Sequence, residues 1–315
     1  MFSVISGQTL TMFLMIVLGY GIFRAGLVDH AGNKAISDIL LLVVTPCMIL
    51  QNFSTSPYDP ARVRSFLLAI ALGFAAHFVM ILISSIFLRG DSGKNADLGI
   101  ERYLAVYSNC GFMGIPIVSA VFGGEGVLYV TAYMVSFNVL TWTHGLSEIT
   151  GKRSLKQLGK GLCSSVVLSI AAGLAIYLLR IPVESHVKSA LSYVGGMNTP
   201  LGMFVAGCAL GETNLLAALK KKRLYLVTVL KLLAGPAAVF AVFLALRLIF
   251  TIPDTVFFTI LIAAACPCGT TGTMFALRYN RDYEHSSQIF VVSTLPSMFT
   301  IPVFVSLAKM IAGIM

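Results

Sequence analysis

The stretch YSNCGFMGIPIVSAVFG, residues 107–123, decides the fold, because it interrupts an apolar segment that is otherwise long enough to cross a membrane. A second interruption, AACPCGTTGTMFALRYN, occupies residues 264–280, about half the chain later. Both stretches carry glycine, proline and small polar residues where a simple span carries leucine and isoleucine. In lipid every backbone amide needs a hydrogen-bond partner, so broken helices persist only where protein or a water-filled cavity surrounds them. Two such breaks, in corresponding positions of two halves, indicate the substrate site of a secondary transporter.

The composition predicts a membrane protein. Hydrophobic residues make up 57% of the 315-residue chain and charged residues only 11%, whereas soluble domains carry about 25% charged residues. Apolar runs of about 20 residues recur from end to end, and each is long enough to cross the hydrocarbon core as a helix. The first run lacks a signal-peptide cleavage pattern, so we expect a permanent span. These features predict an all-α polytopic membrane protein with ten transmembrane helices. The predicted spans are residues 8–27, 36–56, 63–88, 101–122, 127–148, 160–180, 188–211, 223–249, 255–277 and 286–312.

The basic residues predict the orientation, because cytoplasmic loops of membrane proteins are enriched in Lys and Arg. With the N-terminus outside, Lys231 lies within a span and fifteen of the 22 basic residues fall in inner loops. The remaining six fall in outer loops or near the outer ends: Arg62, Arg64, Arg180, Lys188, Arg247 and Lys309. This bias predicts a protein of the cell's inner membrane with both termini outside. The net charge of +9 is dispersed among short loops, so no nucleic-acid surface is expected.

The ten predicted spans divide into two sets of five at the basic stretch GKRSLKQLGKG, residues 151–161. The Thr-Pro pair at 45–46 corresponds to the one at 199–200, and the break at 111–116 corresponds to that at 267–272. The offset between corresponding features is nearly constant. An odd number of spans per half turns the second half upside down, so residues 1–150 and 162–315 are predicted to form an inverted repeat.

The two breaks also carry a family resemblance. The first matches the pattern N-x-x-x-M-G-[IL]-P between Asn109 and Pro116, and the second matches P-x-G-x-x-x-x-x-F-A-x-x-Y between Pro267 and Tyr279. In these residues the chain resembles a bacterial member of the auxin efflux carrier family, whose plant branch contains the PIN-type auxin exporters. Family members often have Asn-Pro early in the sixth span, where this chain has Ser-Ser at 164–165. The resemblance therefore does not imply that the chain binds auxin itself.

The resemblance implies the fold of the bile-acid symporters and sodium–proton antiporters, in which spans 4 and 9 cross as broken helices. Spans 1, 2, 6 and 7 form a scaffold that pairs with a second protomer, and spans 3–5 and 8–10 form a mobile transport domain. The implied function is an elevator-type carrier of a small organic anion, such as malate, malonate or an auxin-like acid. The expected partners are this anion, the lipid bilayer and a second copy of the chain, with no nucleic acid, cofactor or metal.

The candidate substrate-binding residues lie at the two breaks and on predicted spans 5 and 8. Asn109 can donate a hydrogen bond to a carboxylate, or it can cap the half-helix that follows. The threonines of the second break can line a site or bond back to their own helix, and the glycines are expected to permit the broken backbone. Asn198 is expected on the scaffold or dimer face. The complete set is Asn109, Cys110, Gly111, Gly114, Pro116, Asn138, Thr141, Pro267, Gly269, Thr270, Thr271, Gly272 and Lys231.

Two titratable residues lie well inside predicted spans. Lys231 either snorkels to the membrane interface or supplies a fixed positive charge at the crossing. His77 is either a hydrogen-bonded packing residue or a proton site, because imidazole titrates near neutral pH. No Asp or Glu lies at the middle of a predicted span. Since sodium sites usually use carboxylates, we expect transport without sodium, and any pH dependence to pass through His77.

Other classes of protein are less well supported by the sequence. The chain has no G-x-S-x-G or H-E-x-x-H motif, so an intramembrane enzyme is not predicted. A proton-coupled or sodium-coupled symporter of the same fold and an anion channel remain alternatives. Paired breaks in an inverted repeat favour alternating access over a channel.

Overall fold

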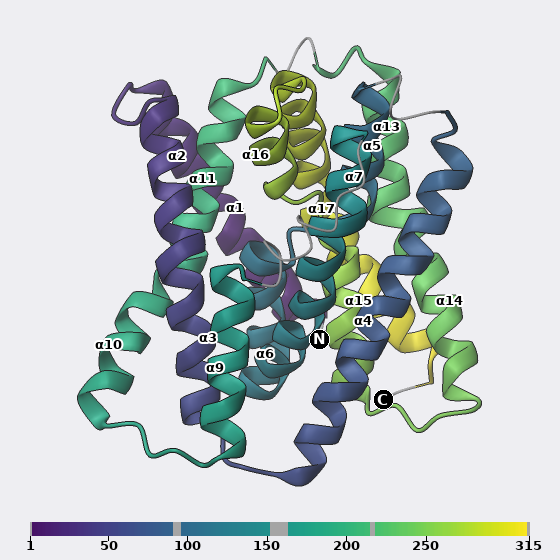
Figure 1. Cartoon of the computed structure of the whole chain (residues 1–315). Helices are drawn as coiled ribbons and strands as arrows, with labels where there is room; N and C mark the ends of the chain where they lie inside the picture. The colour runs from purple at the N-terminus through teal and green to yellow at the C-terminus, as the bar shows by residue number, and fades with distance from the viewer. Residues whose placement is uncertain (1, 91–95, 152–162, 215–217, 314–315) are drawn as a thin grey trace.

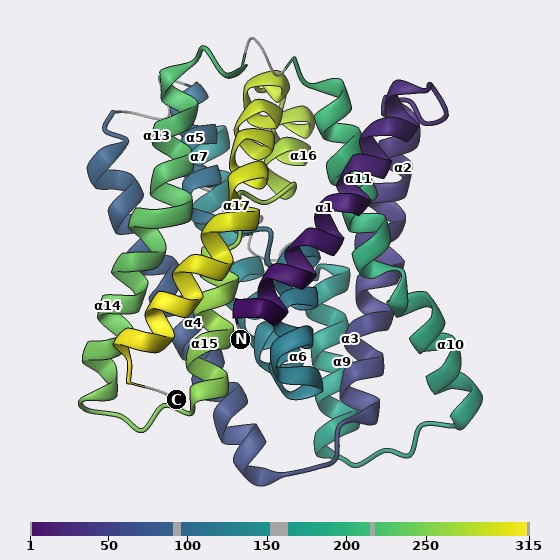
Figure 2. The ribbon, with the colours of Figure 1, turned by 180° about the vertical axis from the view of Figure 1, so that it is seen from behind.

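The described part of the chain, residues 2–90, 96–151, 163–214 and 218–313 of the computed structural model, is helical and contains no strand apart from one isolated bridge (Figures 1 and 2). The helices of the first half are α1 (Phe2–Arg24), α2 (His30–Ile39), α3 (Thr45–Thr55), α4 (Pro60–Phe87), α5 (Ala96–Val106), α6 (Ile115–Leu140) and α7 (Leu146–Thr150). Those of the second half are α9 (Ser165–Leu178), α10 (Ser185–Gly196), α11 (Asn198–Glu212), α13 (Lys222–Val229), α14 (Gly235–Arg247), α15 (Asp254–Ala265), α16 (Thr271–Arg278) and α17 (Tyr283–Ile311). Four π-helical turns join neighbouring helices: η1 (Leu40–Val44), η2 (Cys110–Gly114), η3 (Thr141–Gly145) and η4 (Leu230–Ala234).

Six helical segments within the described residues are long and apolar enough to cross a membrane. They are Phe2–Arg24, His30–Thr55, Pro60–Phe87, Cys110–Thr150, Lys222–Arg247 and Tyr283–Ile311. Two shorter apolar helices, α9 and α15, accompany them. The chain is therefore an all-helical, multi-pass membrane protein, as its composition predicts.

The other predicted spans fall on shorter or interrupted helices. The predicted span 101–122 covers the end of α5, η2 and the first part of α6, and span 127–148 begins in the second part of α6. Gly123, with φ 62° and ψ −150°, is not helical and separates the two parts of α6 by a kink. Spans 188–211 and 255–277 correspond to the pairs α10–α11 and α15–α16. Span 160–180 corresponds to α9, and most of the basic stretch 151–161 lies outside the described residues.

Three of the π-helical turns end directly before a helix whose second residue is proline. Pro46 follows η1, Pro116 follows η2 and Pro236 follows η4. Proline has no N–H and its ring clashes with the carbonyl four residues earlier, so the preceding turn widens. Proline thus explains why these spans are locally wide or interrupted.

Close helix contacts rely on small residues. A Cβ atom added to Gly19 of α1 would lie 2.6 Å from the carbonyl oxygen of Phe204 in α11, and one on Gly207 of α11 would overlap the backbone of Ile16. Glycine lets the two backbones approach, as at many helix interfaces in membranes. On the opposite face of α1, Leu10, Leu14 and Leu18 are more than half exposed, as expected for side chains in contact with lipid.

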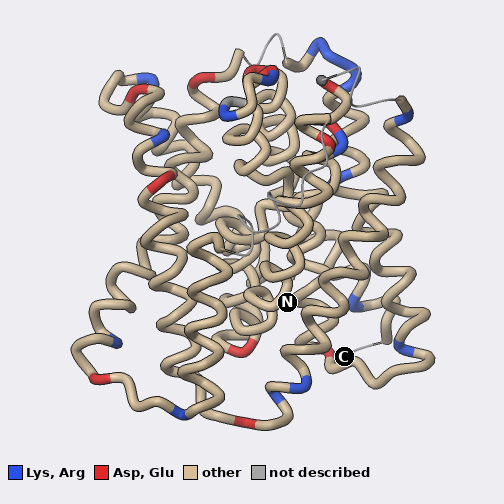
Figure 3. The backbone as a smooth tube through the Cα atoms, in the orientation of Figure 1, with Lys and Arg blue, Asp and Glu red and all other residues tan. Residues whose placement is uncertain are grey.

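Charged residues lie mostly toward the two ends of the bundle (Figure 3). Lys and Arg are densest at the upper end in that view, where α13 begins. This end also holds the starts of α2 and α17 (Figures 1 and 2). Lys231, in η4, is the exception, because its side chain is completely buried.

Candidate functional site

The two helix breaks meet in space. Helix α5 ends at Val106 and α15 ends at Ala265, and the residues that follow them pair as an antiparallel bridge between Ser108 and Cys268. The amide of Asn109 donates to the carbonyl oxygen of Pro267 at 2.8 Å, and the amide of Gly269 donates to that of Tyr107 at 2.9 Å. These two bonds satisfy backbone groups that the broken helices leave free, which is a requirement at membrane depth.

The glycines of the second break allow this close approach. A Cβ atom on Gly269 would lie 3.1 Å from the carbonyl oxygen of Ser108, and one on Gly272 would overlap the side chain of Leu104. In the first break, a Cβ on Gly114 would lie 3.4 Å from the Cys266 sulfur. Any side chain at 269 or 272 would therefore push the two breaks apart.

Lys231 holds the two breaks together. Its side chain is 0% exposed, so the snorkelling alternative is wrong for this residue. The Nζ atom donates to the Ser108 hydroxyl at 2.8 Å and to the carbonyl oxygens of Val106 and Ala264, each at 3.2 Å. Those carbonyls end α5 and α15, where the helix dipole places partial negative charge. The lysine cation therefore stabilises two helix C-termini at once, and no carboxylate among the described residues forms an ion pair with it.

Asn109 presents an unused hydrogen-bond donor beside this pairing. The residue is 4% exposed, and its Nδ2 atom has no partner among the described residues. It precedes η2, yet its side chain makes no capping bond, and its carbonyl oxygen accepts the amides of Met113 and Gly114 instead. The capping alternative is therefore not what this conformation shows. An unsatisfied buried donor costs about 1–3 kcal/mol, so this amide is a natural contact for a ligand.

Some of the remaining predicted residues lie at the paired breaks, and others lie on neighbouring helices. Thr271 accepts a hydrogen bond at 3.0 Å from the hydroxyl of Tyr103, and Thr270 is buried. Asn138 donates to the carbonyl of Met134 in its own helix, and Thr141 is buried at the start of η3. The predicted residues that make contacts between the two breaks and the helix ends beside them are Asn109, Gly114, Pro267, Gly269, Thr271, Gly272 and Lys231. Cys110, Gly111 and Thr270 adjoin these residues in the chain.

A polar cavity of about 550 Å³ lies among α1, α3, α6, α10 and α11. Of the predicted site residues only Pro116 lines it. Asn198, which the sequence predicts on the scaffold or dimer face, lies on α11 of the predicted scaffold and also lines this cavity. Its side chain donates to the Gly111 carbonyl oxygen at 3.2 Å and accepts from Thr45 at 2.9 Å. No lining residue carries a charge. The lining residues are Gln8, Met48, Gln51, Asn52, Thr55, Ile115, Pro116, Ser119, Ala120, Gly124, Val127, Ser192, Gly195, Gly196, Asn198 and Thr199.

Asn52 is the cavity residue that sequence reasoning missed. It is 6% exposed, and its Nδ2 atom has no partner among the described residues. The sequence feature that could have identified it is the Gln51-Asn52 pair within an apolar run. A side-chain amide at membrane depth is energetically costly unless it has a hydrogen-bond partner. The described part of the protein therefore has two buried amide donors without a partner, that of Asn52 at the cavity and that of Asn109 at the first break.

His77 packs in an aromatic environment behind the first break. Its Nδ1 atom lies 2.7 Å from the Gly73 carbonyl oxygen, and its Nε2 atom has no partner among the described residues. The rings of Tyr133, Tyr107 and Phe137 surround it at centroid distances of 4.6, 5.9 and 6.2 Å. This geometry fits a neutral imidazole that donates from Nδ1 to Gly73 and leaves Nε2 without a hydrogen bond.

The fold and the paired breaks define a class, a polytopic membrane transporter, and comparison with known proteins supports the same class. The chain matches the model of the membrane transport protein family over residues 4–160 and 152–305. It therefore belongs to this family, the auxin efflux carrier family. An uncharacterized transporter of Methanothermobacter thermautotrophicus is 22% identical over 302 residues, which cover 94% of this chain and 95% of that protein.

Proposed function

We propose that this transporter is a secondary, elevator-type carrier of a small organic anion, such as malate, malonate or an auxin-like acid. The observation that carries the proposal is the buried, unpartnered amide of Asn109 next to two paired helix breaks. A carboxylate oxygen accepts such a donor, and a charge-assisted hydrogen bond is stronger than a neutral one.

The helix ends around the breaks favour an anion. Helices α5 and α15 end there, and the ammonium of Lys231 offsets their partial negative charge. Segments η2 and α16 begin there, at Cys110 and Thr271, and their N-terminal ends carry partial positive charge. Two positive helix ends thus remain for a ligand, which is the usual arrangement of an anion site at helix N-termini.

The neutral cavity supports a substrate with a polar body. Asn52, Gln51 and Ser119 offer donors and acceptors from α3 and α6, without a cation. Pro116 and Asn198 connect this cavity with the first break. We therefore place the carboxylate near Asn109 and the rest of the substrate toward the cavity.

We also propose the ten-span topology, with a 5+5 inverted repeat and spans 4 and 9 crossing at the breaks. The antiparallel pairing of the breaks supports it, because an in-plane two-fold axis between the halves would pair them in this way. Both termini then face outside the inner membrane. Labelling of a C-terminal tag by an impermeant reagent in intact cells tests this orientation, and a tag that labels only after lysis contradicts it.

Helix packing supports a division into a scaffold and a transport domain. Helix α1 packs along α11, and α3 packs on α9 and α10, all from the predicted scaffold. Helix α4 packs on α6 and α14, and α15 packs on α6, all from the predicted transport domain. On α10, the side chains of Val187 and Tyr193 are exposed and could contact a second protomer. This arrangement suits an elevator carrier that dimerises through its scaffold.

Sodium-coupled transport is a weaker alternative, because Lys231 already places a cation between the two breaks and no described carboxylate accompanies it. An anion channel is also a weaker alternative, because paired breaks in an inverted repeat favour alternating access.

Ligand binding by the purified protein tests the proposal. Malate, malonate and indole-3-acetate should be screened for a rise in melting temperature, because a ligand that binds the native state stabilises it. Asn109→Ala should weaken binding of the active acid about 10- to 150-fold, as expected for a lost hydrogen bond to a charged group. The control is Asn33→Ala, another buried asparagine with an unpartnered amide atom, located in α2. Equal affinity of Asn109→Ala and the parent would place the site elsewhere.

A further inference from the structure

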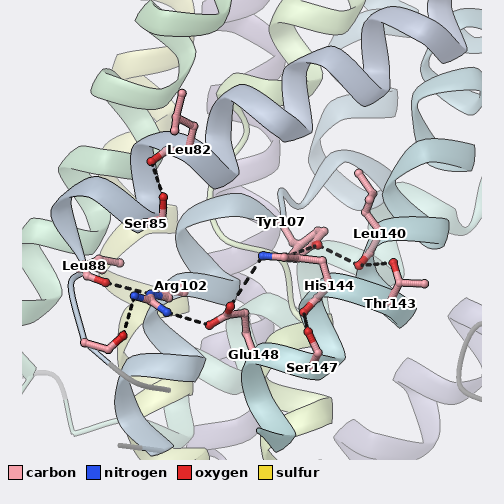
Figure 4. A network of polar contacts seen from close by, with 11 residues as sticks. Leu82, Ser85, Leu88, Arg102, Tyr107, Leu140, Thr143, His144, Ser147 and Glu148 are labelled. Atoms are coloured by element: carbon pink, nitrogen blue, oxygen red, sulfur yellow. Dashed lines mark hydrogen bonds and ion pairs between the residues drawn. The ribbon is translucent and has the colours of Figure 1, made fainter. Parts of the chain in front are cut away.

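A chain of polar side chains runs from the first break toward the basic end of the molecule (Figure 4). The Tyr107 hydroxyl lies 3.1 Å from Nδ1 of His144, and Nε2 of His144 lies 3.8 Å from a carboxylate oxygen of Glu148. The other oxygen of Glu148 lies 3.3 Å from Nη1 of Arg102. His144 lies near the end of the predicted span 127–148, and its side chain is 28% exposed.

Arg102 fixes the carboxylate of Glu148. The guanidinium donates to the carbonyl oxygens of Leu88 and Gly90, at 2.8 and 3.0 Å, in addition to its ion pair with Glu148. These bonds tie the carboxylate to the segment that follows α4. With one oxygen held by Arg102, Glu148 directs its other oxygen toward Nε2 of His144.

The Tyr107 hydroxyl distinguishes two states of His144. The hydroxyl donates to the Leu140 carbonyl oxygen at 2.9 Å, so its oxygen can accept a proton-bearing Nδ1 of His144. A protonated His144 then has an oxygen facing each ring nitrogen, Tyr107 at one and Glu148 at the other. When the Nδ1 proton leaves to solvent, Nδ1 becomes an acceptor, and the Tyr107 hydroxyl can turn from Leu140 to His144.

We infer that His144 is a proton-binding site whose occupancy sets the hydrogen bond made by Tyr107 at the first break. The effect on transport rests on the proposed function, whereas proton binding by His144 does not. Tyr107 also accepts the amide of Gly269 through its backbone and lies two residues before Asn109. A change at its hydroxyl is therefore placed to alter the substrate region.

The surroundings favour His144 over His77 as the proton site. A proton added to His77 would fall on Nε2, which has no acceptor among the described residues, in a ring that stacks on Tyr133. Among the described residues, the titratable or charged groups around the Tyr107–His144 pair include His77 of α4, Tyr103 and Arg102 of α5, Tyr133 of α6, Glu148 of α7, Lys231 of η4 and Arg281, which binds the end of α7. Among these, Glu148 alone supplies a carboxylate to a protonated imidazole.

Histidine NMR of the purified full chain tests the site without any substrate. Isotope-labelled histidine should give a resonance that titrates between about pH 5 and 8, and it should be absent from His144→Gln. Tyr107→Phe should shift its midpoint, because the phenylalanine removes the oxygen that accepts from Nδ1. A His144 resonance that does not titrate in this range overturns the inference.

The transport rate tests the consequence. If a carboxylate is transported, its initial rate should change by up to about tenfold between pH 5.5 and 7.5, as for a group that titrates near neutral pH. His144→Gln should flatten this profile, whereas His77→Gln and the control His186→Gln, whose side chain is 95% exposed on α10, should keep it. A parent-like profile in His144→Gln overturns the coupling. If the parent transports no carboxylate, the proposed function fails while the NMR titration still decides the proton site.

Discussion

At the scale of single residues, Lys231 shows how one side chain organises the centre of this protein. The sequence places a lysine inside a span, and membrane physics makes such a residue either an interfacial anchor or a functional charge. The structure decides between these by giving its Nζ atom three oxygen partners on both breaks. The acceptors are two carbonyls and a serine hydroxyl, groups that every sequence contains, so no sequence pattern could have identified them.

Replacing Lys231 by methionine should destabilise the protein by about 2–4 kcal/mol. The change leaves the Val106 and Ala264 carbonyls and the Ser108 hydroxyl without their donor, and the gain from removing a buried charge offsets only part of this loss. Thermal unfolding in detergent measures the effect. Lys188→Met, at a partly exposed position of α10, is the control. Equal melting temperatures of Lys231→Met and the parent would show that the ammonium does not hold the breaks together.

The candidate site could be predicted from the sequence only where it coincides with a break. Asn109 and Gly269 stand out because polar and flexible residues are rare at membrane depth. Asn52 and Tyr103 were not predicted, because each lies in an ordinary helical stretch and gains its importance from neighbours distant in the chain. Asn198 was predicted on the scaffold or dimer face, and its hydrogen bond to the Gly111 carbonyl oxygen joins segments too distant in the chain for a sequence pattern to connect.

At the scale of helices, the glycine and proline residues correctly predict where helices are interrupted, but they do not predict the residues at which helices begin and end. The stretch 111–116 predicts the break that the structure shows as η2, and 267–272 predicts the gap between α15 and α16. Helix α1 begins at Phe2, whereas its predicted span begins at residue 8. The first turns of the helix are partly polar, so a span defined by its apolar residues does not include them. Pro296 and Pro302 lie within α17 without ending it.

The α1–α11 interface provides a test at this scale. Gly19→Ala should destabilise the protein by about 1–3 kcal/mol, since the new methyl group would lie 2.6 Å from the Phe204 carbonyl oxygen and force the helices apart. Gly21→Ala, two residues later in the same helix, has open space and should be neutral or slightly stabilising. Melting temperatures of the two variants provide the comparison. A similar loss in both would mean that helix propensity, and not the close contact, controls this position.

At the scale of the whole molecule, composition alone predicts a multi-pass membrane protein, and the family match confirms the transporter class. The meeting of residues 107–109 with 267–269 could be anticipated only through the symmetry of an inverted repeat, because no local pattern connects segments so far apart. The cavity could not be anticipated, since its walls come from five helices of both halves. The ten-span topology, the elevator movement and the dimer stay predictions.

Counterflow in reconstituted vesicles tests the central claim most directly, namely that the paired breaks carry a small carboxylate across the membrane. Vesicles loaded with unlabelled malate or malonate should take up the labelled acid in a saturable manner, and an inward sodium gradient should leave the initial rate unchanged. Asn109→Ala should lose at least about tenfold in apparent affinity, while Asn33→Ala should match the parent. Uptake that does not saturate, accumulation driven by sodium, or parent-like transport by Asn109→Ala would contradict the claim.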